Sequence, residues 1–268
     1  MQEAIESPRE PRALPRLLAD SFESFIGTLP VSAVVWTVSL VPSFVAMFML
    51  TGMLGGPPDR EHLRAAVMAG NYAPTVLLLG AGLLQAALNV LALGAVVLAV
   101  DAFQRRTPLS LGDAIGASAG VWFSLVCTQL LAGFWVLLGF ICLIVPGILM
   151  ALRYALVHVT VLLEGRTGNA ALARSKELML RHMGRILGSL LVVVVVAVIM
   201  TGFGYLVMKV ATFPLPATPQ ADVVRQYLLS LPGKIIGTWP IAATVLLFRD
   251  VAAEQPAPAP EPGAPAAI

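Results

Sequence analysis

The sequence predicts an all-α, polytopic membrane helix bundle with six transmembrane helices and several interfacial helices. Hydrophobic residues make up 58% of the 268 residues and charged residues only 12%, whereas a soluble domain carries about 25% charged residues. Several apolar runs also reach the ~20 residues that cross a bilayer. The net charge of +2 is too small to predict a nucleic-acid partner.

The chain divides into a long membrane domain and two short tails. Residues 1–12 are polar, and residues 1–20 contain no long apolar core and do not resemble a cleaved signal peptide. Residues 252–268 are rich in Pro and Ala and lack a core-forming pattern. We therefore expect disordered tails at 1–12 and 252–268, with a six-helix transmembrane domain at 13–251.

Apolar length and helix breakers locate the elements in order. Apolar residues at helical spacing predict interfacial helices at 15–26, 109–119 and 170–183, the last capped by Asn169. Short helices are expected from Asp59 to about residue 69 and from Asp222 to about residue 232. The predicted spans cover residues 30–54, 73–100, 120–144, 148–163, 186–212 and 233–248.

Two proline-containing motifs interrupt these spans. Val145, Pro146 and Gly147 predict a tight, charge-free turn between the third and fourth spans, and Pro240 interrupts the sixth. Pro146, Gly147 and Pro240 are therefore candidate structural residues. The order of surface helix, outgoing span, turn and returning span recurs over residues 13–104, 107–165 and 169–250. This pattern suggests three parallel repeats, with three independent hairpins as the alternative.

The distribution of basic residues predicts the orientation of the chain. Lysines and arginines on one side of the six spans outnumber those on the other, eleven to five. Because basic residues favour the cytoplasmic side, we expect both termini in the cytoplasm. The larger set is Arg9, Arg12, Arg16, Arg105, Arg106, Arg166, Arg174, Lys176, Arg181, Arg185 and Arg249; the smaller set is Arg60, Arg64, Lys209, Arg225 and Lys234.

Arg153 is the main candidate for a functional residue. It lies six residues past the Pro146–Gly147 turn, roughly 9 Å along a helix at ~1.5 Å per residue. Charges at this depth are costly and mark functional sites. Three interpretations remain open: Arg153 ties helices together through carbonyls, Asn89 or Gln129; it binds an anion such as a lipid phosphate; or it snorkels to the interface.

Glu164 and His158 share the fourth span with Arg153. Eleven residues separate Glu164 from Arg153, so a continuous helix would place both on one face. Glu164 is expected to pair with Arg166, Arg174 or a neighbouring surface helix, and a gating role is the alternative. His158 is interpreted as a packing residue or, less simply, as a ligand-binding residue.

The helix over 170–183 carries a basic patch of Arg174, Lys176 and Arg181. Such a patch can contact anionic lipid headgroups or can simply follow the positive-inside rule. We predict no metal site and no cofactor, because metal-binding and phosphate-cradling motifs are missing from the sequence. The sequence likewise contains no recognisable set of catalytic residues.

A set of motifs in the last 150 residues resembles a bacterial family of six-helix membrane proteins. The motifs are Val145-Pro146-Gly147-Ile148, Arg153, Glu164, the run Ala171-Leu172-Ala173-Arg174-Ser175-Lys176-Glu177-Leu178 and, after Pro240, Leu247-Phe248-Arg249-Asp250-Val251. The family, the YciC-like membrane proteins, is related to the membrane domain of some glycerophosphoryl diester phosphodiesterases. Arg249 stands where an aromatic residue is usual. The resemblance implies six spans in the plasma membrane, a structural role for Ser175, and no hydrolase, since the catalytic barrel is missing.

These observations favour a non-enzymatic integral membrane protein that handles lipid or organises the membrane around a partner. Its expected partners are membrane lipids and a membrane or cytoplasmic protein. The alternative is a small transporter of an anionic or amphiphilic solute with Arg153 and Glu164 on its path. An intramembrane enzyme would need His158 next to an acid or to a nucleophile such as Ser124 or Thr160.

Overall fold

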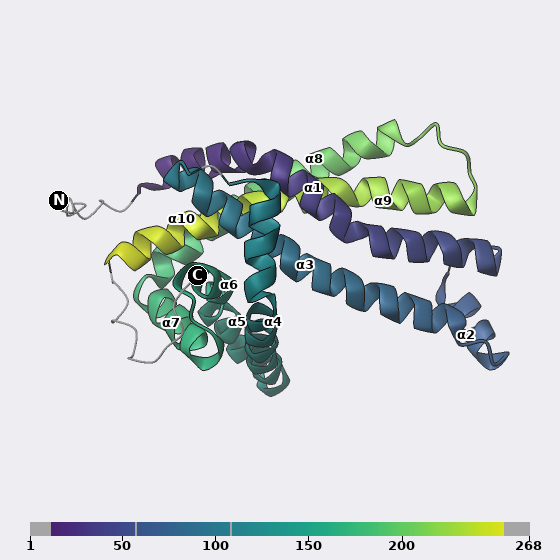
Figure 1. The fold of residues 1–268 in the computed structure, drawn as a ribbon, viewed down its shortest axis with the longest axis horizontal. Helices are drawn as coiled ribbons and strands as arrows, with labels where there is room; N and C mark the ends of the chain where they lie inside the picture. Colours follow the sequence, from purple (N-terminus) through teal and green to yellow (C-terminus); the bar gives the residue numbers. More distant parts are fainter. Residues whose placement is uncertain (1–11, 57, 108, 255–268) are drawn as a thin grey trace. The chain divides into compact units, whose positions relative to one another are not determined.

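The computed structural model describes residues 12–56, 58–107 and 109–254, which fold into α-helices without a strand. Six helical segments are long and apolar enough to cross a membrane, which confirms the predicted all-α polytopic fold (Figure 1). The helices are α1 Leu14–Leu54, α2 Arg60–Met68, α3 Ala73–Arg105, α4 Leu111–Cys142, α5 Ile144–Arg153, α6 Val157–Glu164, α7 Gly168–Arg181, α8 Met183–Ala211, α9 Pro219–Ile236 and α10 Thr238–Glu254.

The predicted disordered tails lie almost wholly outside the described residues. Two parts of them are ordered, however. Arg12 forms ion pairs with Asp20 and Asp250, and residues 252–254 complete the last turn of α10. The membrane domain therefore begins and ends slightly outside the predicted bounds of 13–251.

Two of the three predicted surface helices are continuous with the spans that follow them. Residues 15–26 belong to α1, which continues through Pro30 and Pro42, and residues 109–119 fall largely within α4. In α1, Ser24 and Thr28 donate hydrogen bonds to the carbonyls of Asp20 and Ser24, one turn earlier. Only the third surface helix, α7, is separate from the span that follows it. A distinct surface helix therefore occurs in one of the three predicted repeats.

The turn between α4 and α5 lies at Leu143, just before the predicted position. Leu143 is extended, with φ −169° and ψ 155°, and Pro146 falls in the first turn of α5, where a helix needs no internal donor. Gly139 and Gly147 let the two helices approach closely. A Cβ added to Gly139 would lie 2.9 Å from the Gly147 Cα atom, so both positions require the smallest residue.

The fourth span is broken in the middle, which corrects the prediction of one helix over 148–163. Helix α5 ends at Arg153, and α6 begins at Val157. The break changes the helical phase, so the spacing of Arg153 and Glu164 no longer places them on one face.

The sixth span is longer than the predicted 233–248. Helix α9 continues through Pro232 to Ile236, and α10 begins at Thr238. Pro240 lies in the first turn of α10, a position that tolerates proline. Lys234, expected at the outer end of this span, lies near the middle of the Pro219–Glu254 segment.

The helix caps agree with the sequence in one case of three. Asp59 caps α2 by accepting a 2.8 Å hydrogen bond from the His62 backbone, and this bond with that of the His62 ring holds the pKa of Asp59 below its ordinary value. In contrast, Thr167 rather than Asn169 precedes α7, and Thr218 rather than Asp222 caps α9. Asp222 instead pairs with Arg225.

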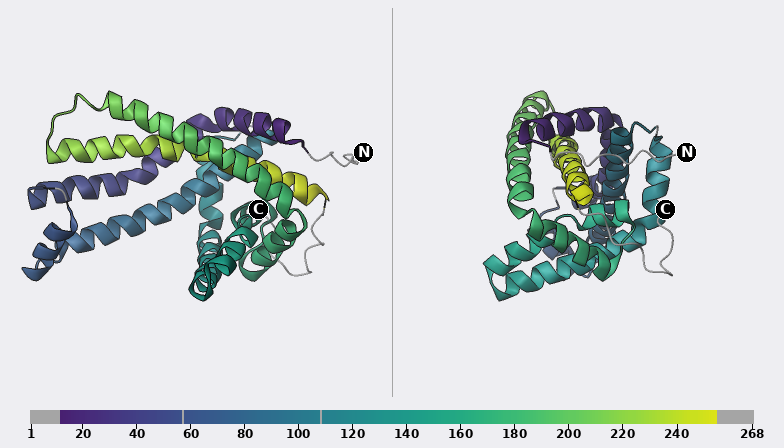
Figure 2. Two further views of the ribbon diagram at one scale, coloured as in Figure 1. Left: turned by 180° about the vertical axis from the view of Figure 1, so that it is seen from behind. Right: turned by 90° about the vertical axis from the view of Figure 1, so that its left-hand side faces the viewer.

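The chain forms two compact units. The first unit comprises the described residues up to 28, residues 94–195 and those from 239 onward; the second comprises residues 29–93 and 196–238. In the first unit, α4 packs against α5, α6 and α7 (Figure 2). Its buried core includes Leu17, Leu246 and Leu247.

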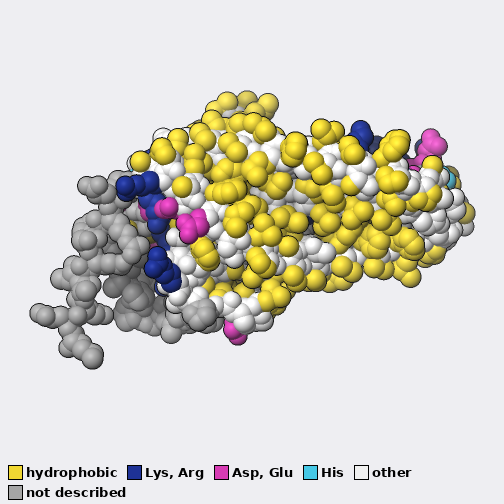
Figure 3. All heavy atoms as spheres, turned by 90° about the horizontal axis from the view of Figure 1, so that it is seen from above, with side chains coloured by type: hydrophobic (Ala, Val, Ile, Leu, Met, Phe, Trp, Pro, Cys, Tyr) yellow, Lys and Arg dark blue, Asp and Glu magenta, His cyan; other side chains and the backbone are white. Residues whose placement is uncertain are grey.

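The second unit is a bundle of the later part of α1, the early part of α3, the later part of α8 and α9. Tyr227 of α9 donates a hydrogen bond to the Thr37 carbonyl of α1, and a Cβ added to Gly204 of α8 would meet Pro232 of α9 at 2.9 Å. Hydrophobic side chains cover most of the molecular face in Figure 3, with charges in small groups. This surface suits helices surrounded by lipid.

Candidate functional site

Arg153 occupies the last position of α5, at the break in the fourth span. Its Nε atom is buried and has no hydrogen-bond partner within the part of the chain that the structure describes. Its backbone carbonyl, freed by the end of the helix, accepts a 2.8 Å hydrogen bond from the Ser175 hydroxyl. The backbone of Arg153 is thus fixed by the protein, whereas the guanidinium keeps a donor for another partner.

The structure does not give Arg153 the partners that the sequence suggested for it as a tie between helices. Asn89 belongs to the second unit, where its Oδ1 atom accepts a hydrogen bond from Lys234 at 3.4 Å. Across residues 12–56, 58–107 and 109–254, no hydrogen bond or ion pair is recorded for the Arg153 side chain. The helix-tie interpretation therefore has no contact to support it, and anion binding and snorkelling both stay predictions.

Helix α7 docks on α6 through a buried ion pair. The Arg174 side chain is 2% exposed, and its Nε atom lies 3.2 Å from Oε1 of Glu164 at the end of α6. Arg166 lies 3.3 Å from the other oxygen of Glu164, and Glu177 lies 3.4 Å from Arg174. The predicted pairing of Glu164 with Arg166 and Arg174 is therefore present.

The three basic residues of α7 lie in different environments. Arg174 is buried in its ion pair, and this position does not fit the contact with lipid headgroups that the sequence suggested. Lys176 and Arg181 are exposed on the same helix. Ser175 is fully buried and anchors the other side of α7 to the Arg153 carbonyl.

His158 lies within α6. Neither an acid nor Ser124 is recorded as its hydrogen-bond partner in the described ranges, and Thr160 donates its hydroxyl to the Leu156 carbonyl at 3.0 Å. The contact that an intramembrane enzyme would need is thus not seen. Among the described residues, no group of three His, Cys, Asp or Glu side chains is close enough to hold a metal.

A second charge cluster joins four helices of the first unit, and sequence reasoning missed it. Asp250 of α10 pairs with Arg12 at 3.3 Å and with Arg185 of α8 at 3.3 Å. Asp101 of α3 pairs with Arg105 and with Arg249 of α10. Arg249 and Asp250, which are adjacent in the C-terminal motif, therefore tie α10 to its neighbouring helices. Two opposite charges side by side were the sequence signal that could have predicted this role.

Lys234 is a cation whose depth in the membrane sequence reasoning predicted wrongly. Its ammonium lies 5.0 Å from the centre of the Trp36 ring and 3.4 Å from Asn89. The signal was present in the sequence, because apolar residues continue on both sides of Lys234. Pro232 was interpreted as the end of a short helix, which moved Lys234 to the edge of the membrane.

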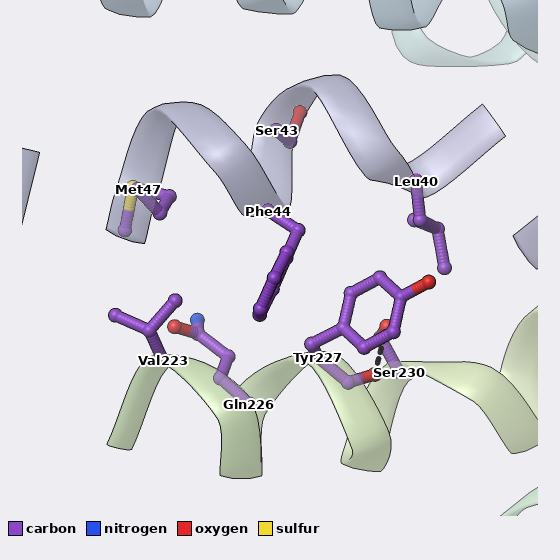
Figure 4. A pocket seen from close by; sticks show the side chains of 8 residues that line it. All are labelled: Leu40, Ser43, Phe44, Met47, Val223, Gln226, Tyr227 and Ser230. Carbon is purple, nitrogen blue, oxygen red and sulfur yellow. Dashed lines mark hydrogen bonds between the residues drawn. The ribbon is translucent and has the colours of Figure 1, made fainter. Parts of the chain in front are cut away.

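Two cavities in the second unit lie on either side of α1. One, of about 180 Å³, lies between α1 and α9, and Figure 4 shows Phe44 and Tyr227 lying between these two helices. The other, of about 590 Å³, lies between α1 and α3. Neither lining includes Arg153 or Glu164. A transport path through those two residues therefore stays a prediction without a cavity to support it.

No family model, no curated protein and no solved structure matches this chain. The resemblance to the YciC-like membrane proteins accordingly stays a prediction based on the motifs. What the motif residues do in this fold is nevertheless visible: Gly147 permits a close helix approach, Glu164 and Arg174 form the ion pair, and Ser175 holds the Arg153 carbonyl.

Proposed function

We propose that this chain is a non-enzymatic integral membrane protein that binds the anionic headgroup of a membrane lipid at Arg153. The observation that carries the proposal is the guanidinium of Arg153. It lies at the break in an apolar span, and its Nε donor is buried without a hydrogen-bond partner among the described residues. A buried cationic group without an anion is costly, so a ligand should supply the charge.

Phosphate is the anion that best fits this position. The planar guanidinium can donate two parallel hydrogen bonds to phosphate oxygens, whereas a lysine acts as a single point charge. An arginine side chain is also long enough to direct its charge toward the headgroup layer while its methylenes stay among apolar residues. The lipid would then be held beside the α5–α6 break.

The protein's own carboxylates support this assignment because they are engaged elsewhere. Glu164, the acid that follows Arg153 along the span, pairs with Arg174 and Arg166. Asp101 and Asp250 belong to the separate cluster that joins α1, α3, α8 and α10. No carboxylate of the described residues pairs with Arg153, which supports a counter-charge from the surroundings.

The membrane and orientation belong to the same proposal. The excess of lysine and arginine on one side, eleven to five, supports both termini in the cytoplasm, and the motif resemblance supports a bacterial plasma membrane. On that side, Lys176 and Arg181 are exposed on α7 and would contact anionic headgroups. The same surface is available to a protein partner, and the motif resemblance supports a lipid-handling or membrane-organising role.

Native mass spectrometry of the protein released from its own membrane tests the proposal. We expect the wild type to retain a phospholipid, Arg153→Lys to retain less, and Arg153→Leu to lose it. Arg64→Leu is the matched control, because Arg64 is exposed on α2. Equal retention by wild type and a folded Arg153→Leu variant would contradict lipid binding at Arg153.

A further inference from the structure

Lys234 is a cation at membrane depth in the second unit. It lies on α9 near the middle of the Pro219–Glu254 span. Two contacts hold its ammonium: Oδ1 of Asn89 at 3.4 Å and the face of the Trp36 ring, whose centre is 5.0 Å away. The Trp36 indole is itself fixed, because its Nε1 atom donates to the Thr238 hydroxyl at 3.2 Å.

These contacts leave the charge of Lys234 without a counter-ion. An ammonium has three donors, and Asn89, which is neutral, accepts one of them. The acids of this unit are Asp59 and Glu61, at the start of α2, and Asp222, which pairs with Arg225 in the first turns of α9. No carboxylate pairs with the half-buried Lys234 in the described part of the chain.

An apolar cavity of about 180 Å³ begins one helical turn from this cation. Leu40 of α1 and Ser230 of α9 line the cavity. Leu40 lies four residues from Trp36, and Ser230 lies four residues from Lys234, which in each case is one turn along the same helix face. Figure 4 shows the cavity between the two helices, with Phe44 and Tyr227 among its walls. Their ring centres are 4.8 Å apart.

We propose that Lys234 binds the carboxylate of a long-chain fatty acid whose first methylenes enter the α1–α9 cavity and whose remaining chain lies in the bilayer. The two remaining ammonium donors suit the two carboxylate oxygens, and the walls of the cavity suit an acyl chain. One lysine balances one negative charge, whereas a phosphate monoester carries about −1.5 to −2 and would leave part of its charge unpaired. This site does not depend on lipid binding at Arg153.

Quenching of Trp36 fluorescence tests the proposal directly. The full chain in phosphatidylcholine nanodiscs is titrated with 5-doxylstearate, whose nitroxide lies close to its carboxylate. We expect saturable quenching that stearate reverses and that Trp36→Phe abolishes. Lys234→Gln should weaken binding by about tenfold or more, as expected for losing hydrogen bonds from a charged donor.

Three controls separate this site from general partitioning into lipid. Lys234→Arg should retain binding because it keeps the charge, and Lys209→Gln should bind like the wild type because Lys209 is exposed on α8. The methyl ester of 5-doxylstearate has the same chain without the charge and should quench weakly in the unaltered protein. Equal affinity for the acid and its ester, or for wild type and Lys234→Gln, would overturn the proposal.

Discussion

Three cations among the helices have different environments: Arg153, Arg174 and Lys234. Arg174 is paired with two carboxylates, Lys234 is held by a neutral amide and an aromatic face, and Arg153 has a buried donor without a partner in the described residues. The same residue class thus performs different tasks, because its neighbours decide whether the charge is compensated within the protein.

The Glu164–Arg174 pair provides the first prediction at this scale. Glu164→Gln should destabilise the fold by about 3 kcal/mol, because it removes a carboxylate partner from the buried guanidinium of Arg174. Thermal unfolding in detergent measures the change. Lys176→Gln, on the exposed face of the same helix, should stay within about 0.5 kcal/mol of the wild type. Equal effects of both substitutions would contradict a buried pair.

Arg106 provides the second prediction. It adopts a left-handed conformation, with φ 55°, at the end of α3, where Thr107 and Arg106 donate backbone hydrogen bonds to Ala102 and Phe103. Glycine is the residue that this helix ending prefers. Arg106→Gly should therefore stabilise the protein by up to about 1 kcal/mol, as measured by thermal unfolding. Arg106→Ala removes the same side chain without relieving the backbone and should give no such gain.

Sequence reasoning at the residue scale succeeded where partners are close along the chain. Glu164 and Arg174 are ten residues apart, so their pairing could be predicted from adjoining helices. The contact of Lys234 with Asn89 joins residues 145 positions apart, and no local pattern specifies it. Asp101 and Arg249 are similarly distant in sequence, and only the packed bundle brings them together.

At the scale of elements, small local choices decide where helices end. Pro146 was expected to form the turn itself, yet it is accommodated in the first turn of α5, and Leu143 breaks the helix instead. Prolines 30, 42 and 232 lie inside helices. The lengths of apolar runs therefore predicted all six spans, whereas the positions of the breaks within them did not follow the prolines.

The close contact between α4 and α5 gives a prediction for one element. Gly139→Ala should destabilise the hairpin by about 1–3 kcal/mol, because the new Cβ would meet the Gly147 backbone, which cannot move aside. Gly133→Ala is the matched control on the same helix, since nothing lies within 4 Å of its Cβ position. It should be neutral or stabilising, as alanine favours helix. Thermal unfolding distinguishes the two variants, and a harmless Gly139→Ala would exclude the close approach.

Ser175 gives a second prediction at this scale. Ser175→Ala removes the donor to the Arg153 carbonyl and should cost about 1–3 kcal/mol, since the carbonyl would be left unsatisfied. Local loss of α7 should follow, and hydrogen exchange along Gly168–Arg181 would detect it. Unchanged exchange in this helix would mean that the Glu164–Arg174 pair alone holds α7 in place.

For the whole molecule, six spans require both termini on the same side of the membrane. In a background without Cys127 and Cys142, a single cysteine at Gly70 or Leu215 should react with an impermeant maleimide on intact cells, and one at Thr107 should not. These three positions lie in the connections between successive spans. Labelling at Thr107 but not at Gly70 would mean that the orientation is the reverse of the proposed one. Labelling at both positions would contradict the number of spans between them.

We propose that a lipid phosphate is the partner of Arg153. Solid-state NMR can measure this contact as dephasing of guanidinium ¹⁵N signals by ³¹P in native lipids, with Arg153→Leu as the reference that identifies the Arg153 signal. We expect strong dephasing of that signal, because a charge-assisted hydrogen bond places nitrogen and phosphate oxygen about 2.7–2.9 Å apart. An Arg153 signal that phosphorus leaves undephased would exclude this contact and would assign the residue a purely structural role.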